Sequence, residues 1–200
     1  IGIYSQKLTI SDCNGDSCFV ILENHITISA LPTAWINEIH YDDNSKDTDE
    51  GVEVVIQNLP AHTLSEFIVS LYNGNNGEVY STANLSDVIP GDTICDKYFY
   101  HHFFSSLQNG SPDGVALSYN GGLLSFISYE GSFIATDGPA AGIQSFDIIV
   151  HETSSTPVGS SLQCSGSGDR LNQFFSQNST DQTFGHCNNN QYLLWPDSTI

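Results

Sequence analysis

Basic side chains are scarce in this chain of 200 residues. Lys and Arg number 4 against 23 Asp and Glu, which gives a formal charge of -19 at pH 7. Such an excess of negative charge repels phosphate backbones and anionic membrane surfaces. Nucleic acid is therefore excluded as an expected partner, and Ca²⁺ is an expected counter-ion and cofactor for the crowded carboxylates.

Methionine is absent, and no apolar run approaches the roughly 20 residues that a membrane-spanning helix requires. Long Lys/Glu/Ala stretches of helical character are also missing, whereas Ser, Thr, Asn and Gly are abundant. We therefore expect an all-β protein without a membrane span. The chain starts at Ile1 without a leader segment, as a mature secreted product would, so we expect an extracellular location, secreted or at the cell surface.

Cysteines are few and odd in number. There are five, and none shows the CxxC spacing of metal sites. In an oxidising compartment Cys13 can pair with Cys18 across a short turn, and Cys164 can pair with Cys187 across a polar stretch. Cys95 is then left over, either as a buried thiol or as an intermolecular bridge to a neighbouring copy.

Three triplets fit the pattern for N-glycosylation. Those at Asn84 and Asn178 are the predicted sites, and the one at Asn109 is weaker because Pro112 follows it. They predict surface glycans only if the producing organism is a eukaryote.

Alternation of apolar and polar residues predicts short strands along most of the chain. Turn signals separate them at intervals of about ten residues, which is typical of a sandwich of antiparallel strands. Residues 98–107 fit either a short helix or a buried strand. The main predicted strands are residues 1–4, 18–22, 26–30, 35–41, 52–56, 67–72, 78–80, 114–118, 123–129 and 146–150.

Two neighbouring motifs resemble the opening of a known domain. Residues 34–42 read Ala-Trp-Ile-Asn-Glu-Ile-His-Tyr-Asp, and residues 50–54 read Glu-Gly-Val-Glu-Val after an acidic loop. Further matching stretches follow in the same order at 112–117, 126–131, 136–142 and 160–163. Over residues 33–191 the chain resembles the secreted, bacterial type of lamin tail domain. The resemblance implies an immunoglobulin-like β-sandwich that binds or assembles, and it supplies no catalytic residues.

The resemblance divides the chain into an amino-terminal strand arm at 1–32, a sandwich at 33–191 and a tail at 192–200. An apolar, β-patterned arm outside a complete sandwich has backbone groups and side chains that need cover. It can fold back, or it can complete the sheet of a neighbouring copy, and head-to-tail repetition then gives a filament. The predicted contact residues are Ile1, Ile3, Leu8, Ile10, Phe19, Ile21, Ile26 and Ile28.

Carboxylates concentrate between the two motifs and supply enough oxygen ligands for Ca²⁺. The predicted ligands are Glu38, Asp42, Asp43, Asp47, Glu50 and Glu53. The loop is not an EF-hand, because Val54 stands where the bidentate Glu would be. The alternative is a solvated acidic loop without a metal.

Signals for catalysis are weak. Glu38 and Glu53 can be read as the acid and base of a glycosidase, but alternation on an exposed sheet face would also place carboxylates there for solubility. His101 and His102 are adjacent, and adjacent strand residues point to opposite faces. No nucleophile elbow, HExxH or P-loop occurs. We expect that the protein is not an enzyme.

The leading hypothesis is a structural subunit of an extracellular filament or surface assembly, a homopolymer joined by strand donation from the arm. The alternative is a calcium-dependent adhesion or carbohydrate-binding module of a larger secreted protein. In that case aromatic side chains such as Trp35, Tyr72 or Trp195 would be exposed and would contact a glycan.

Overall fold

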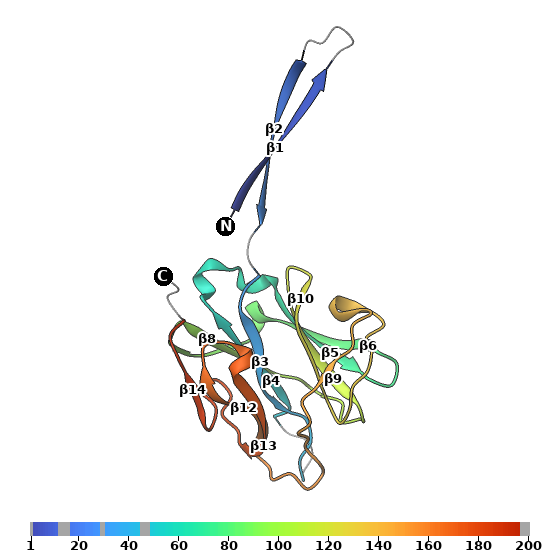
Figure 1. Cartoon of the computed structure of the whole chain (residues 1–200). Helices are drawn as coiled ribbons and strands as arrows, with labels where there is room; N and C mark the ends of the chain where they lie inside the picture. Colours follow the sequence, from blue (N-terminus) through green and yellow to red (C-terminus); the bar gives the residue numbers. More distant parts are fainter. Residues whose placement is uncertain (1, 12–16, 29–30, 45–48, 197–200) are drawn as a thin grey trace. The chain divides into compact units, whose positions relative to one another are not determined.

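Two compact units make up the chain, Ile1–Leu31 and Pro32–Ile200 (Figure 1). The computed structural model describes the backbone of residues 2–11, 17–28, 31–44 and 49–196, and the side chains of the last two ranges. Strands dominate both units, and the helices of the described residues are 3₁₀ turns of three residues each. The predicted all-β class is confirmed.

The first unit is a β-hairpin. Strands β1 (Gly2–Ser11) and β2 (Ser17–Ile28) pair antiparallel and form a two-stranded sheet of their own. In the register of the paired stretch, Leu8 lies opposite Val20 and Ile10 lies opposite Cys18. The side chains of the predicted contact residues lie outside the described residues. Ile1 lies outside the described residues.

The second unit is a sandwich of two sheets. Its five-stranded sheet has the order β11-β10-β9-β5-β6, and the larger sheet has the order β13-β12-β3-β4-β8-β7, with β14 added beside β12. The strands of the smaller sheet are β5 (Phe67–Asn73), β6 (Glu78–Asn84), β9 (Asp113–Tyr119), β10 (Gly122–Tyr129) and β11 (Phe146–Asp147). The larger sheet contains β3 (Ala34–His40), β4 (Gly51–Gln57), β7 (Ile89–Ile94), β8 (Lys97–Phe103), β12 (Ser160–Gly168), β13 (Phe174–Asp181) and β14 (Gln191–Leu193). The 3₁₀ turns are η1 (Leu59–Ala61), η2 (Leu64–Glu66), η3 (Leu85–Asp87), η4 (Gly138–Ala140) and η5 (Leu171–Gln173).

Each sheet is covered on both faces. The main core lies between the sheets and includes Val54, Val69 and Leu117. A second cluster around Tyr72 and Phe133 forms on the outer face of the smaller sheet, and a third joins Trp35 and Phe99 to Leu193 on the outer face of the larger one. Double coverage explains why β3, β4 and β9 are buried almost without interruption rather than at alternate positions.

Three segments differ from the sequence analysis or complete it. Residues 97–103 form strand β8, so the ambiguous segment is a strand between β4 and β7. The predicted strand at 146–150 shortens to the two residues of β11, because Ile149 has φ of 71° and breaks the extended run. Tyr192 and Leu193, placed in the tail by the resemblance, pair with β12 as part of β14.

Candidate functional site

A β-bulge brings Glu38 of β3 opposite Glu53 of β4. The register shifts between Ile36 and Glu38, so Asn37 and Glu38 both face the outer side of the larger sheet. Glu38 and Glu53 are 1% and 0% exposed. The expectation that alternation leaves these carboxylates on a solvated face is therefore wrong, because residues 183–191 cover this side of the sheet.

Each carboxylate of this pair accepts several hydrogen bonds. Glu38 accepts from the Ser161 hydroxyl and from both the backbone N–H and the hydroxyl of Thr183, at 2.7 and 3.0 Å for the latter two. Glu53 accepts from the Asn37 amide at 2.9 Å and from the Gly185 N–H. The two glutamates thus tie the covering segment to the sheet.

Burial raises the pKa of both glutamates. The effect is larger for Glu53, where the neighbouring Glu38 charge adds to the cost of removing the carboxylate from water. Two close carboxylates in such a site retain a proton at a pH where exposed ones are ionised. The arrangement can therefore store a proton within the sheet.

A second buried cluster lies where β3 ends and the acidic loop begins. The His40 Nδ1 lies 3.1 and 3.0 Å from the two carboxylate oxygens of Glu152, and the same carboxylate accepts from the backbone N–H of Tyr41 at 2.7 Å. The ring of Tyr41 stacks on Tyr129 at a centroid distance of 3.8 Å. Glu152 thereby fixes the segment that follows β11 to the end of β3.

The predicted calcium ligands do not form one group. Glu38 and Glu53 lie on the sheet with protein donors, whereas Asp43 is 3.6 Å from the His40 Nε2 and Glu50 accepts from the Leu107 N–H. Asp42 donates its backbone N–H to Glu152 at 3.2 Å, and Asp47 lies outside the described residues. Within residues 31–44 and 49–196 no three His, Cys, Asp or Glu side chains are arranged to hold a metal.

The predicted Cys164–Cys187 disulfide is absent, since both thiols are free, as is Cys95. The Cys164 Sγ donates to the Ile36 carbonyl at 3.6 Å, and the Cys187 Sγ donates to the Gln191 carbonyl at 3.2 Å. Burial raises the pKa of the Cys164 thiol to about 12, which keeps it protonated and poorly reactive. Cys13 and the side chain of Cys18 lie outside the described residues.

The other residues that were predicted to lie on the surface differ in their exposure and contacts. Trp35 and Tyr72 are fully buried and cannot face a glycan, whereas Trp195 is 70% exposed. Asn178 is exposed on β13, an edge strand, and is open to modification. Asn84 is engaged, because its side chain donates to the Ser65 carbonyl and accepts from the Ser86 N–H.

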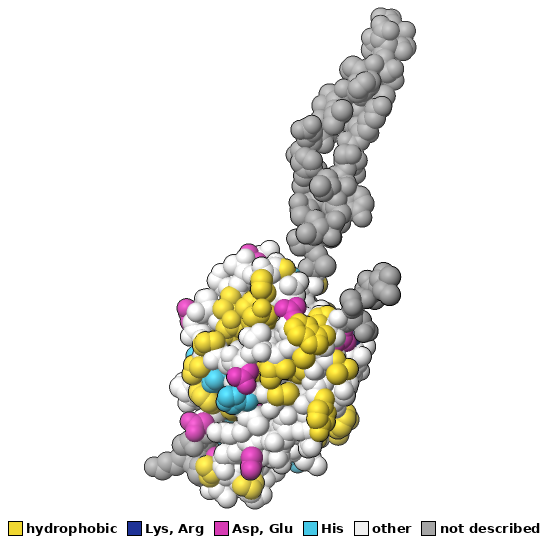
Figure 2. All heavy atoms as spheres, turned by 90° about the vertical axis from the view of Figure 1, so that its left-hand side faces the viewer, with side chains coloured by type: hydrophobic (Ala, Val, Ile, Leu, Met, Phe, Trp, Pro, Cys, Tyr) yellow, Lys and Arg dark blue, Asp and Glu magenta, His cyan; other side chains and the backbone are white. Residues whose placement is uncertain are grey.

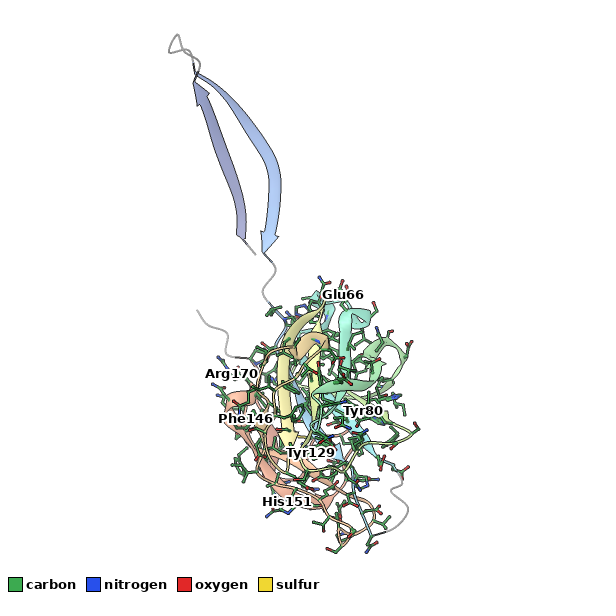
Figure 3. The ribbon with its side chains drawn as sticks, turned by 90° about the vertical axis from the view of Figure 1, so that its right-hand side faces the viewer. Glu66, Tyr80, Tyr129, Phe146, His151 and Arg170 are labelled. Carbon is green, nitrogen blue, oxygen red and sulfur yellow. The ribbon has the colours of Figure 1, made fainter. Side chains whose placement is uncertain are left out.

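An apolar groove that no sequence motif predicted opens beside the sandwich core. It has a volume of about 700 Å³ and runs between β10 and β11 on one side and β12 and β13 on the other. Figure 3 shows this side of the molecule, with Phe146 beside the orange strands β12 and β13, between Arg170 at one end and His151 at the other. The available signal was the run Phe146 to Val150, which is too apolar for an exposed edge strand.

Figure 2 shows one face of the second unit, on which acidic side chains and histidines lie among hydrophobic patches. No Lys or Arg side chain is visible on this face. The His186 Nδ1 lies 3.0 Å from a carboxylate oxygen of Asp92.

No helix in the described part of the chain is long and apolar enough to cross a membrane. Comparisons with protein-family models, curated proteins and solved structures found no match for this chain.

Proposed function

We propose that this protein is a structural subunit of an extracellular filament or surface assembly, and that copies join through the amino-terminal hairpin. The observation that supports this most is the sheet formed by β1 and β2, which has no third strand among the described residues. A two-stranded hairpin alone is at best marginally stable in water. It gains stability when its edge or its apolar face is covered by another sheet.

A hairpin given to the next copy makes a heterologous contact, because the donor surface differs from the acceptor surface. Such a contact propagates into a filament unless its rotation closes a ring. The sandwich supports this role as a rigid body covered on both faces of both sheets. We propose further that it is a lamin-tail-type domain, on the strength of the ordered motifs from Trp35 to Gln163.

Electron microscopy of two samples tests the proposal. Negative-stain images of the full chain should show filaments, whereas a chain that begins at Pro32 should remain monomeric. Circular dichroism of the shortened chain must show that its β-sheet content is retained. Monomers in both samples would contradict the proposal and favour an arm that covers its own domain.

One observation supports the alternative of a carbohydrate-binding adhesion module. Tyr192 and Trp195 are both largely exposed near the end of the chain, where aromatic rings can stack on sugar. In this proposal Ca²⁺ binds the loop 42–50. Glycan-array binding that requires Ca²⁺ and is lost on Trp195→Ala would support it. Binding that persists with EDTA would remove the calcium requirement.

A further inference from the structure

The smaller sheet has an incomplete edge at β10. Strand β10 pairs with β9 along its whole length, from Gly122 to Tyr129. On its other side β11 bridges only Ile127 and Ser128. No strand among the described residues pairs with 123–126 on that side. The backbone groups of this stretch can therefore accept another strand.

The apolar groove begins next to this stretch, where Ile127 of β10 lines it. Ile36, Ile39 and Leu162 of the core line it, and Phe146 and Phe175 stand at its rim with 70% and 64% of their surfaces exposed. Aromatic side chains with this much exposure beside a cavity indicate a surface that is covered in a complex. The unpaired edge of β10 and the groove thus adjoin each other at Ile127.

The groove is neutral in a strongly acidic molecule. Among the residues that line it only Glu38 carries a charged side chain, and that carboxylate is buried and hydrogen-bonded to Thr183. Copies that each carry a formal charge of -19 repel one another over most of their surfaces. The electrostatic repulsion between two copies is therefore weakest where they meet at such an uncharged apolar surface.

We propose that this groove is the acceptor site for the hairpin of a second copy, with one hairpin strand paired to residues 123–126 of β10. The inference rests on the proposed function and assigns its acceptor surface. The hairpin fits this place because β1 and β2 span ten and twelve residues, longer than the eight-residue β10. Its paired stretch also carries apolar residues, among them Leu8 opposite Val20 and Ile10 opposite Cys18 in the register.

Variants of the full chain test the acceptor site. The double variant Phe146→Asp, Phe175→Asp places two charges at the groove rim. Because both side chains are largely exposed, we expect the variant to fold. Ile89→Asp, at an apolar residue that is 51% exposed on β7 and outside the groove, is the matched control. We expect the groove variant to lose at least ten-fold in polymer mass by sedimentation, and the control to polymerise as the wild type does.

A mixing experiment shows whether the hairpin is the occupant. A second variant, Leu8→Asp with Leu22→Asp, impairs the hairpin and leaves the groove intact. Each variant alone should be monomeric by light scattering, whereas an equimolar mixture should form a heterodimer through one intact hairpin and one intact groove. Circular dichroism should show the same sheet content in all chains.

Failure of the acceptor site is distinguishable from failure of the proposed function. A groove variant that polymerises like the wild type, while the hairpin variant does not, would overturn the groove and keep the filament. A mixture that stays monomeric would also overturn the groove. A wild-type chain that never polymerises would overturn both.

Discussion

Among single residues, the buried pair of Glu38 and Glu53 shows how one irregularity changes a surface. A regular β3 would direct Asn37 and Glu38 to opposite faces, but the bulge places both on the outer face beside Glu53. Residues 183–191 then cover both glutamates and remove their carboxyl groups from water, while the backbone N–H groups of Thr183 and Gly185 donate to them. The raised pKa values follow from this cover.

The glutamate pair predicts a decrease in stability as pH rises. The pKa values of both glutamates in the folded chain lie above the ordinary Glu value of 4.5, so the folded chain binds more protons than the unfolded chain above that pH. The free energy of unfolding should fall by about 1 kcal/mol per pH unit while this difference persists. Glu53→Gln should flatten the dependence in urea melts from pH 4 to 8. Glu78→Gln, at an exposed carboxylate, should leave it unchanged, and parallel curves for wild type and Glu53→Gln would disprove the account.

At the scale of elements, the segment from Thr183 to Leu193 is the cover of the larger sheet. The Gly185 carbonyl accepts from the Asp92 N–H of β7 at 2.7 Å, while the Gly185 N–H donates to Glu53. Its far end pairs with β12 as β14. The cover is thus attached to the edge, the middle and the opposite side of one sheet.

Gly91 permits this attachment, and Gly91→Ala tests it. An added Cβ would lie 2.3 Å from the Gly185 carbonyl oxygen, a backbone atom that cannot move without loss of the Asp92 hydrogen bond. We expect a loss of about 1 to 3 kcal/mol in the free energy of unfolding. Thr93→Ala, at an exposed residue on the same strand, should change it by less than about 0.5 kcal/mol. Equal unfolding midpoints for wild type and Gly91→Ala would contradict the role of the close approach.

Across the whole molecule, negative charge opposes the apolar contact of the proposed filament. The net charge favours separation of copies in dilute salt, whereas the proposed contact between groove and hairpin contains no ion pairs. The Debye length falls from about 30 Å at 0.01 M to about 10 Å at 0.1 M, so repulsion between copies weakens over this range.

Salt should therefore promote assembly of the proposed filament. The fraction of sedimented protein is expected to rise as NaCl increases from 10 to 500 mM in the presence of EDTA. Choline chloride should act like NaCl if screening alone is responsible. A fall in polymer with salt would indicate ion pairs at the contact and would contradict an apolar, uncharged acceptor.

The sequence by itself determined the all-β class and many of the strand positions, because period-two alternation and turn residues act over a few neighbours. Strands at 52–56, 67–72 and 123–129 follow from such local patterns. The acidic character also follows from composition alone.

The contacts of the buried carboxylates, the groove and the cysteine environments were decided only by the tertiary structure. The cover over Glu38 and Glu53 depends on residues more than 120 positions away, and no local pattern reports such a contact. His40 finds Glu152 in the same way. The groove likewise joins residues far apart in the sequence, from Ile36 of β3 to Ile127 of β10 and Phe175 of β13. Cysteine pairing likewise depends on where the side chains point, and Cys164 and Cys187 donate to different carbonyls.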